Sequence, residues 1–345
     1  MNTIGCTRAQ HLILYTDFLR NLGCPVDRLL KRSRIPVYIE EFPDAWVPLK
    51  FGFDFVGRSA SEQGISDLGF QVSQKLNYFD LSSEFLLKAQ FTPSSYRRLK
   101  LFAENVTFED NTLVCGIVAE NTNARVFCDL GYPASGQELR QSEWLQVMSL
   151  VNIVRVSLGP DWQPIEITFK SEIAPCEAAL KTFQRTRLLV GQAMTSITAP
   201  TISLAMPIST PRPPNNALQY WGDRPTPLNV TSAEPEHFPL LLRDILEPYF
   251  AEGIPPVKLA AEIANMSVRT LQRKLKNVSM SYSDILAQCR FQIAVKHLCD
   301  PGIKMTDIAY QAGYTDPSNF SRAFRSVSGM SPSEFRSRQV TEANA

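Results

Sequence analysis

Residues Met305–Arg336 read MTDIAYQAGYTDPSNFSRAFRSVSGMSPSEFR, and the spacing of their apolar side chains predicts two short helices joined by a tight turn. Gly313 can adopt the positive φ that ends the first helix. Asp316 and Pro317 are typical of the start of the second helix, as its cap and its first position. The side chains that would form the buried faces are Ile308, Ala309, Ala312, Phe320 and Phe324. This pattern is typical of a helix-turn-helix, whose second helix enters the major groove of DNA.

The same pattern occurs earlier in the chain, in Val257–Lys276, which reads VKLAAEIANMSVRTLQRKLK. Asn265 takes the place of the turn glycine, and asparagine tolerates a left-handed conformation better than most residues. Ser267 would cap the second helix of this copy, on which Leu271 and Leu275 replace the two phenylalanines. The chain is therefore predicted to carry two helix-turn-helix units.

Between the two copies, Ser281–Cys299 shows apolar positions at helical spacing, which predicts one long helix. Its 19 residues, at about 1.5 Å each, would span roughly 28 Å. This length is close to the roughly 34 Å that separates successive major-groove openings on one face of B-DNA. One monomer is therefore expected to reach two adjacent grooves.

At these residues the chain resembles the AraC/XylS family of bacterial transcription regulators. The family signature runs through the second helix-turn-helix as IA...G(F/Y)...F.R.F(K/R)...G.(S/T)P..(F/Y)R, and the resemblance covers roughly the last hundred residues. The positions that fill the signature are Ile308, Ala309, Gly313, Tyr314, Phe320, Arg322, Phe324, Arg325, Gly329, Ser331, Pro332, Phe335 and Arg336. The resemblance implies a sequence-specific DNA-binding regulator of transcription.

The resemblance also implies which side chains read DNA, because the outward positions of both second helices meet base edges in the family. By motif position these base-contacting residues are Arg269, Gln272, Arg273, Ser318, Asn319 and Arg322. Other cations of the same region are expected to contact phosphate, which positions a protein on DNA without reading sequence. These phosphate-contacting residues are Lys274, Lys276, Arg325, Arg336 and Arg338. The alternative is that the outward side chains are only solvated.

The charge of the chain is unevenly distributed. Lys and Arg number 35 against 34 Asp and Glu, which gives a net charge of +1. From residue 265 to 340, however, basic residues outnumber acidic ones by about six. A local basic surface of this kind predicts DNA binding that weakens as salt is added.

Length and composition predict two domains. The chain has 345 residues, more than one ordinary core needs, and 44% are hydrophobic, as in soluble globular proteins. Seven prolines between Met206 and Pro235 indicate an extended linker. We expect an effector-sensing and dimerisation domain in residues 1–205, a linker in 206–235 and the DNA-binding domain in 236–345. The expected fold class is α+β for the first domain, followed by an all-α domain of two helix-turn-helix units.

The amino-terminal half mixes helical and strand periodicity. The helices predicted there are Leu12–Leu22, Val26–Arg32, Leu49–Ser61, Leu68–Leu76, Tyr96–Asn105 and Gly136–Leu158, and the strands are Leu113–Ile117, Arg125–Leu130 and Ile165–Phe169. This half weakly resembles the amino-terminal domain that family catalogues label arabinose-binding on one branch of AraC-type regulators. No effector-binding residue follows from that resemblance. Charged and aromatic side chains often line effector pockets, so the candidates are Arg125, Arg187, Trp144 and Trp162.

No catalytic residue, cofactor site or metal site is predicted, and the chain is not expected to be an enzyme. The three histidines lie outside the common catalytic signatures, and the seven scattered cysteines form no C-x-x-C pair. Disulfides and zinc are therefore both disfavoured. Two alternatives stay open: a redox-sensing thiol pair such as Cys115 and Cys128, or an effector-independent regulator whose first domain only dimerises.

The expected partner is double-stranded DNA. We also expect a homodimer held by the amino-terminal domain through an exposed apolar helix face, a small-molecule effector, and RNA polymerase if the regulator is an activator. No apolar stretch is long enough to suggest a membrane span, and the first ten residues lack a signal-peptide core. The expected location is therefore the cytoplasm, in association with the nucleoid.

Overall fold

The computed structural model describes residues 4–134, 136–207 and 237–343. The chain divides into two compact units, an amino-terminal unit of residues 5–35 and 47–231 and a carboxy-terminal unit of residues 1–4, 36–46 and 232–345. Residues 36–46 thus group with the carboxy-terminal unit, whereas the sequence placed them in the first domain. In that unit the backbone N–H of Val37 donates to Glu252 Oε1 at 2.7 Å. Apart from Met206 and Pro207, the predicted linker lies outside the described residues.

The amino-terminal unit is α+β, as the sequence predicted. Its helices are α1 (Ala9–Asn21), α2 (Val26–Arg32), α3 (Leu49–Gln63), α4 (Leu68–Ser73), α5 (Ser83–Ala89), α6 (Ser95–Asn105), α7 (Gly136–Leu158), α8 (Glu177–Thr182) and α9 (Thr201–Ala205), with short 3₁₀ turns η2 (Tyr78–Asp80) and η3 (Val106–Phe108). The helix predicted at 136–158 is confirmed with the same bounds as α7, and that at 26–32 with the same bounds as α2.

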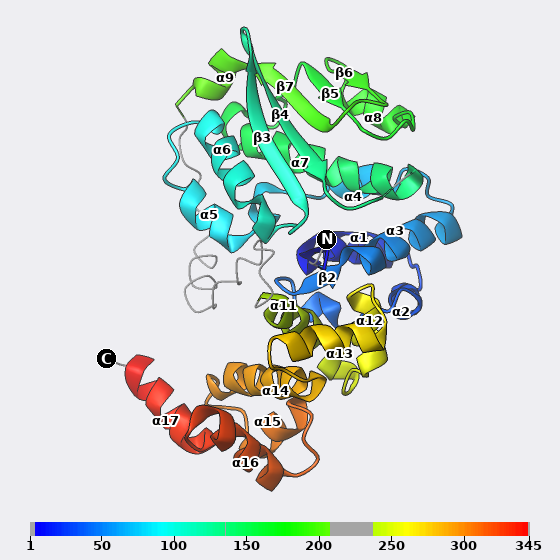
Figure 1. Cartoon of the computed structure of the whole chain (residues 1–345). Coiled ribbons are helices and arrows are strands. Elements are labelled where there is room, and N and C mark those ends of the chain that lie inside the picture. The colour runs from blue at the N-terminus through cyan, green and yellow to red at the C-terminus, as the bar shows by residue number, and fades with distance from the viewer. Residues whose placement is uncertain (1–3, 135, 208–236, 344–345) are drawn as a thin grey trace. The chain divides into compact units, whose positions relative to one another are not determined.

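A five-stranded sheet has the order β3-β4-β7-β5-β6. Its strands are β3 (Leu113–Glu120), β4 (Asn123–Leu130), β5 (Glu166–Thr168), β6 (Arg187–Leu189) and β7 (Thr195–Pro200), and β1 (Cys6–Arg8) pairs separately with β2 (Trp46–Pro48). All neighbouring pairs are antiparallel except β5 and β6. Alternate residues of β4 are buried, because one face of the sheet packs against α6 and α7 (Figure 1).

The core of this unit contains an aromatic cluster centred on Trp144 of α7. The Trp144 ring lies 4.8 Å from Phe70, 4.7 Å from Phe169 and 6.0 Å from Phe183, measured between ring centroids. Only 2% of Trp144 is exposed. The cluster therefore joins α4, α7 and the segments around β5 and α8 into one core.

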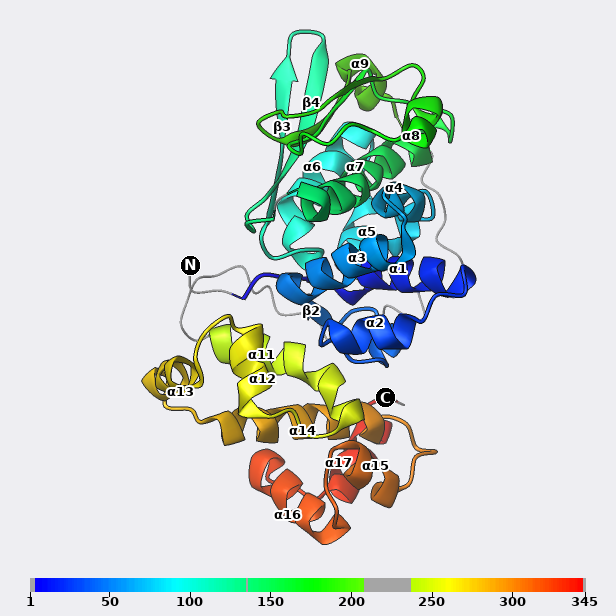
Figure 2. The same cartoon turned by 90° about the vertical axis from the view of Figure 1, so that its right-hand side faces the viewer.

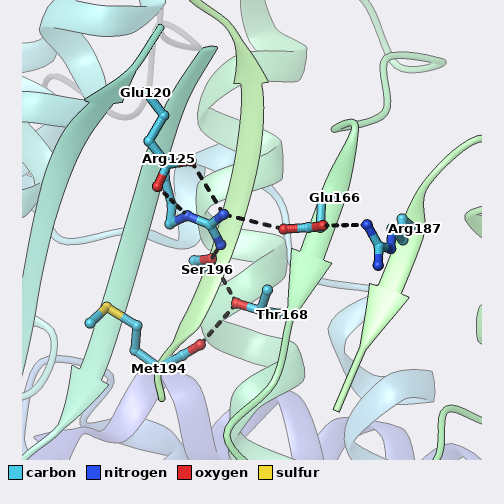
Figure 3. A network of polar contacts seen from close by, with 7 residues as sticks. All are labelled: Glu120, Arg125, Glu166, Thr168, Arg187, Met194 and Ser196. Carbon is cyan, nitrogen blue, oxygen red and sulfur yellow. Dashed lines mark hydrogen bonds and ion pairs between the residues drawn. The ribbon is translucent and has the colours of Figure 1, made fainter. Parts of the chain in front are cut away.

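The other face of the sheet carries a polar network, drawn in Figure 3. Arg125 lies at its centre, with Nε 2.8 Å from Glu120 Oε1 and one terminal nitrogen 3.3 Å from Glu166 Oε1. Glu166 also pairs with Arg187 at 3.8 Å. The Arg125 guanidinium donates to Ser196 Oγ at 3.3 Å, so the network links β3, β4, β7, β5 and β6.

Cys115 and Cys128 are joined by a disulfide across β3 and β4, which corrects the expectation that disulfides are disfavoured. The two residues oppose each other directly in the strand register, with a Cα–Cα distance of 4.3 Å. They are the two cysteines that the sequence analysis named as an alternative thiol pair, and the register of the two strands brings them together.

The carboxy-terminal unit is helical. Its elements are η1 (Ile39–Glu41), α11 (His237–Leu246), η4 (Glu247–Glu252), α12 (Val257–Ile263), α13 (Val268–Asn277), α14 (Tyr282–Leu298), α15 (Met305–Gln311), α16 (Pro317–Ser328) and α17 (Pro332–Ala343). Both views show α14 running between the pair α12 and α13 and the pair α15 and α16 (Figures 1 and 2). Within the described parts of the chain, no helix is long and apolar enough to cross a membrane.

Candidate nucleic-acid interface

The first helix-turn-helix consists of α12 and α13. Asn265 at the turn has a φ of +50°, and the Ser267 hydroxyl accepts the backbone N–H of Thr270 at 3.1 Å. These observations confirm both the turn residue and the helix cap that the sequence predicted. Leu271 and Leu275 are fully buried on the inner face of α13. On the opposite face of α13, Arg269 and Arg273 are exposed.

The second helix-turn-helix consists of α15 and α16, and it repeats this geometry. Gly313 has a φ of +76°, and Asp316 Oδ1 accepts the backbone N–H of Ser318 at 2.8 Å. Phe320 and Phe324 are each 2% exposed. The predicted turn glycine, cap and buried anchors of this unit are all confirmed.

The helix α14 connects the two helix-turn-helix units. It packs against α11, α15, α16 and α17. A reciprocal capping box fixes its start, since the Ser281 hydroxyl accepts the Asp284 N–H at 3.2 Å and Asp284 Oδ2 accepts the Ser281 N–H at 2.7 Å. With 17 residues, α14 is about 25 Å long, slightly shorter than the sequence predicted. A single helix thus sets the distance between the two helix-turn-helix units.

All six side chains predicted to contact bases are exposed. Three lie on α13 and three on α16: Arg269, Gln272, Arg273, Ser318, Asn319 and Arg322. On α16 the guanidinium of Arg322 donates to Asn319 Oδ1 at 2.6 Å, a pairing that the sequence analysis missed although a spacing of three residues permits it. Arg322 and Asn319 therefore present one joint donor surface.

The cations predicted to contact phosphate fall into two groups. Lys274 is half-buried, and its ammonium lies 3.7 Å from the centroid of the Phe238 ring, where burial lowers the pKa of Lys274. Arg336 is half-buried and donates to the carbonyl oxygen of Ile303 at 2.8 Å. Both side chains thus have structural contacts within the domain. The exposed members of the set are Lys276, Arg325 and Arg338.

Aromatic rings form the core around the second helix-turn-helix unit. The Phe324 ring lies 4.9 Å from Phe291 on α14, 5.8 Å from Phe320 and 5.4 Å from Phe335 on α17. Phe324 thus joins three helices of the domain. Because these rings hold α16 against α14, they also fix the direction in which the exposed face of α16 points.

The four effector candidates of the amino-terminal unit do not come together in one site. Arg125 and Arg187 belong to the ion-pair network of the sheet, and Trp144 lies in the aromatic core. Trp162 is half-buried, and its carbonyl oxygen accepts from Arg155 Nε at 3.0 Å. None of the four is among the residues that line the cavity of this unit. Polarity and aromatic character alone were therefore a poor guide to the pocket.

Comparisons with known proteins agree with this geometry. A family described as helix-turn-helix domain matches residues 260–338. The HTH-type transcriptional regulator VirS of Mycobacterium tuberculosis is 23% identical over 334 residues, which cover 95% of this chain and 96% of that protein. The HTH-type transcriptional regulator GadX of Escherichia coli K12 is 32% identical over 119 residues, covering 31% of this chain and 43% of that protein.

Among solved structures, the transcriptional regulator CdpR from Pseudomonas aeruginosa aligns over 91% of this chain and 96% of its own, with 17% identity and a TM-score of 0.40. These comparisons give no support to the arabinose-binding label for the amino-terminal half. Two tandem helix-turn-helix units with matching turns and caps, the domain match and regulators among the relatives lead to one conclusion. Residues 260–338 form a helix-turn-helix domain of the AraC type, and the chain is similar to HTH-type transcriptional regulators over most of its length.

Proposed function

We propose that one chain reads two adjacent major grooves of its operator, with α13 in one groove and α16 in the next. The base contacts are made by Arg269, Gln272, Arg273, Ser318, Asn319 and Arg322. The phosphate contacts are made by Lys276, Arg325 and Arg338. The amino-terminal unit serves effector sensing and dimerisation, and an activating complex would also contact RNA polymerase.

The observation that carries this proposal is the repeated geometry of two exposed helix faces. In both units a residue of positive φ ends the first helix and a capped second helix buries two apolar anchors. The opposite face of each second helix is exposed and polar or basic. Helix faces of this kind bind base edges through arginine, asparagine and glutamine side chains.

Arg273 and Arg322 hold equivalent positions in the two units, and each is expected to contact a base edge. Replacing either with alanine should cost about 1–3 kcal/mol of discrimination between operator and random DNA. Lys276→Ala is the matched control, since loss of a phosphate contact weakens binding to all DNA sequences. It should also lower the slope of the logarithm of the binding constant against the logarithm of salt concentration by about one. A gel-shift competition at several salt concentrations distinguishes these outcomes. Unchanged preference in Arg322→Ala would refute the assignment.

The proposed dimer has support from β3, one of the two edge strands of the five-stranded sheet. An edge strand offers unpaired backbone groups to a second copy, and β3 also exposes Val114 at 60% and Val118 at 48%. Among the described residues, exposed apolar side chains of this unit lie on several separate elements, so the expected apolar helix face is not observed. We therefore place the interface on β3. The full chain should sediment as a dimer at micromolar concentration. Val118→Lys should raise the dissociation constant of the dimer at least tenfold.

Redox sensing is a second candidate function, favoured by the Cys115–Cys128 pair across β3 and β4. The bond would form by exchange with a small-molecule disulfide, which takes up both electrons and leaves as two thiols while the cysteines lose two protons. Operator affinity of the oxidised and the reduced chain should then differ at least threefold, and Cys115→Ser should abolish the difference. Equal affinity of both forms in a glutathione redox buffer would exclude this candidate.

A further inference from the structure

A cavity of about 110 Å³ lies inside the amino-terminal unit. Side chains of α1, α3, α6, α7, β3 and β4 contribute to its wall, and every lining residue belongs to this one unit. Most of the wall is apolar and includes Leu12, Phe53, Val56, Phe102, Leu130 and Leu145. An apolar pocket with a few polar groups is the usual form of a small-molecule site.

The size of the cavity limits what it can hold. A cavity of about 150 Å³ accommodates benzene in a protein core, so the volume here corresponds to roughly one ring. Gly52 of α3 lines the cavity, and a Cβ atom added to it would meet no other atom within 4 Å. Glycine inside a helix is less stable than alanine. Its missing side chain at this position leaves the cavity open.

His11 supplies a polar atom at the cavity wall. Its Nε2 lies 3.1 Å from Oε2 of Glu109, a second residue of the cavity wall. Nδ1 is buried and has no hydrogen-bond partner among the residues that the structure describes. Buried polar atoms without a partner are rare in folded proteins. The accessible surface of Nδ1 is below 1 Å², so this atom does not face the cavity.

The charges around the cavity disfavour an anion. Three carboxyl side chains line it, those of Glu109, Asp110 and Glu138, whereas His11 is its only basic lining residue. Burial alone would raise the pKa of Glu109, but Arg8, His11 and the backbone N–H of Ser82 outweigh this effect and lower the pKa to about 2. Glu109 is thus ionised at neutral pH. A carboxylate ligand would lie close to a fixed negative charge in a poorly solvated site.

We propose that this cavity binds a neutral or cationic apolar molecule of about one ring, such as an aromatic alcohol or amine, and discriminates against anions. The ring replaces water against the apolar wall, and the carboxylates around the cavity repel an anionic group. An effect of this ligand on DNA binding rests on the sensing role proposed above for the amino-terminal unit. The site itself is tested by ligand binding alone.

The first experiment titrates the full chain with benzyl alcohol, benzylamine and benzoate by isothermal calorimetry. The alcohol, the amine or both should bind at least tenfold more tightly than benzoate. Tighter binding of the amine would show that the carboxylates attract a cation, and equal binding would show that they only exclude an anion. Benzoate binding as tightly as the other two, or no binding of any of the three at millimolar concentration, overturns the proposal.

The second experiment blocks the cavity. Gly52→Leu adds a side chain to the open space and should weaken binding of the alcohol or the amine at least tenfold. Ser61→Leu places the same side chain on an exposed position of α3 and should leave binding unchanged. Retained binding in Gly52→Leu with native circular dichroism also overturns the proposal. Operator preference of Arg322→Ala is measured without ligand, so the proposed DNA reading stands or falls separately.

Discussion

Phe324→Ala is expected to unfold the second helix-turn-helix and to abolish operator binding. Phe324 is 2% exposed and contacts the rings of Phe291, Phe320 and Phe335, so its removal leaves a cavity where three helices meet. Truncation of a buried phenylalanine costs about 3–5 kcal/mol. This cost is large against the roughly 5–15 kcal/mol that stabilise an ordinary domain.

The distribution of tryptophan makes this prediction easy to measure. The described carboxy-terminal helices, residues 237–343, contain no tryptophan, whereas Trp144 lies in the core of the amino-terminal unit. Trp46 groups with the carboxy-terminal unit, so the test uses a Trp46→Phe background. In it, Phe324→Ala should reduce helical circular dichroism and operator binding without moving the transition seen by tryptophan fluorescence. Val327→Ala is the control on the same helix, because Val327 is 54% exposed and should lose less than about 0.5 kcal/mol. Equal operator affinity of the two variants would contradict the role given to Phe324.

The carboxy-terminal domain could be predicted from the sequence because local chemistry specifies it. A turn residue that tolerates positive φ, a capping side chain and apolar anchors four residues apart all act within one short segment. Asn265, Ser267, Gly313 and Asp316 accordingly do in the structure what the sequence predicted. The resemblance to a family then supplied the outward positions.

The features that the sequence did not predict depend on contacts between distant segments. Strand β7, the central partner of β4 and β5, was missed because its pairing residues lie far along the chain. Helix α5 was also missed. Lys274 has the helical position of a surface cation, yet its ammonium lies over the ring of Phe238 on α11. The spacing of residues within α13 cannot predict a contact with a side chain of another helix.

The cavity was missed for the same reason. Its wall joins residues from α1, α3, α6, α7 and the sheet, which are separated by up to about 140 positions. The sequence analysis instead chose exposed charges and large aromatics, and Trp144 and Arg125 proved to hold the core and the sheet together. A small residue such as Gly52 leaves room in a cavity, and amino-acid composition alone does not predict where a cavity forms.

Glu109→Gln is expected to destabilise the amino-terminal unit by about 3–5 kcal/mol, since it leaves a buried cation without its partner. Glu109 Oε2 lies 3.2 Å from Arg8 Nε and 3.1 Å from His11 Nε2, and its side chain is 4% exposed. The backbone carbonyl of Glu109 also accepts the N–H of Arg8 at 2.8 Å. The ion pair therefore attaches β1 and α1 to the segment before β3, and its loss should lower the midpoint of urea unfolding followed by tryptophan fluorescence.

The pH dependence of stability separates Glu109 from its neighbour Asp110. The pKa of Glu109 is lowered from 4.5 to about 2, so its contribution of about 3 kcal/mol is present above pH 4.5 and is lost as the pH falls toward 2. Burial raises the pKa of Asp110 from 3.8 to about 6, although hydrogen bonds from Thr112 oppose this shift. Asp110 therefore favours the folded state below pH 3.8 and costs stability as the pH rises through 6.

The two acids should thus respond in opposite ways to amide substitution. At pH 7 Glu109→Gln loses stability, whereas Asp110→Asn removes a buried charge, keeps an acceptor for Thr112 and should unfold at an equal or higher urea concentration. The difference between Glu109→Gln and the unmodified chain should be constant from pH 5 to 7 and should shrink below pH 4.5. A difference that grows on acidification, or a destabilised Asp110→Asn at pH 7, would show that the charge states assigned to this buried cluster are wrong.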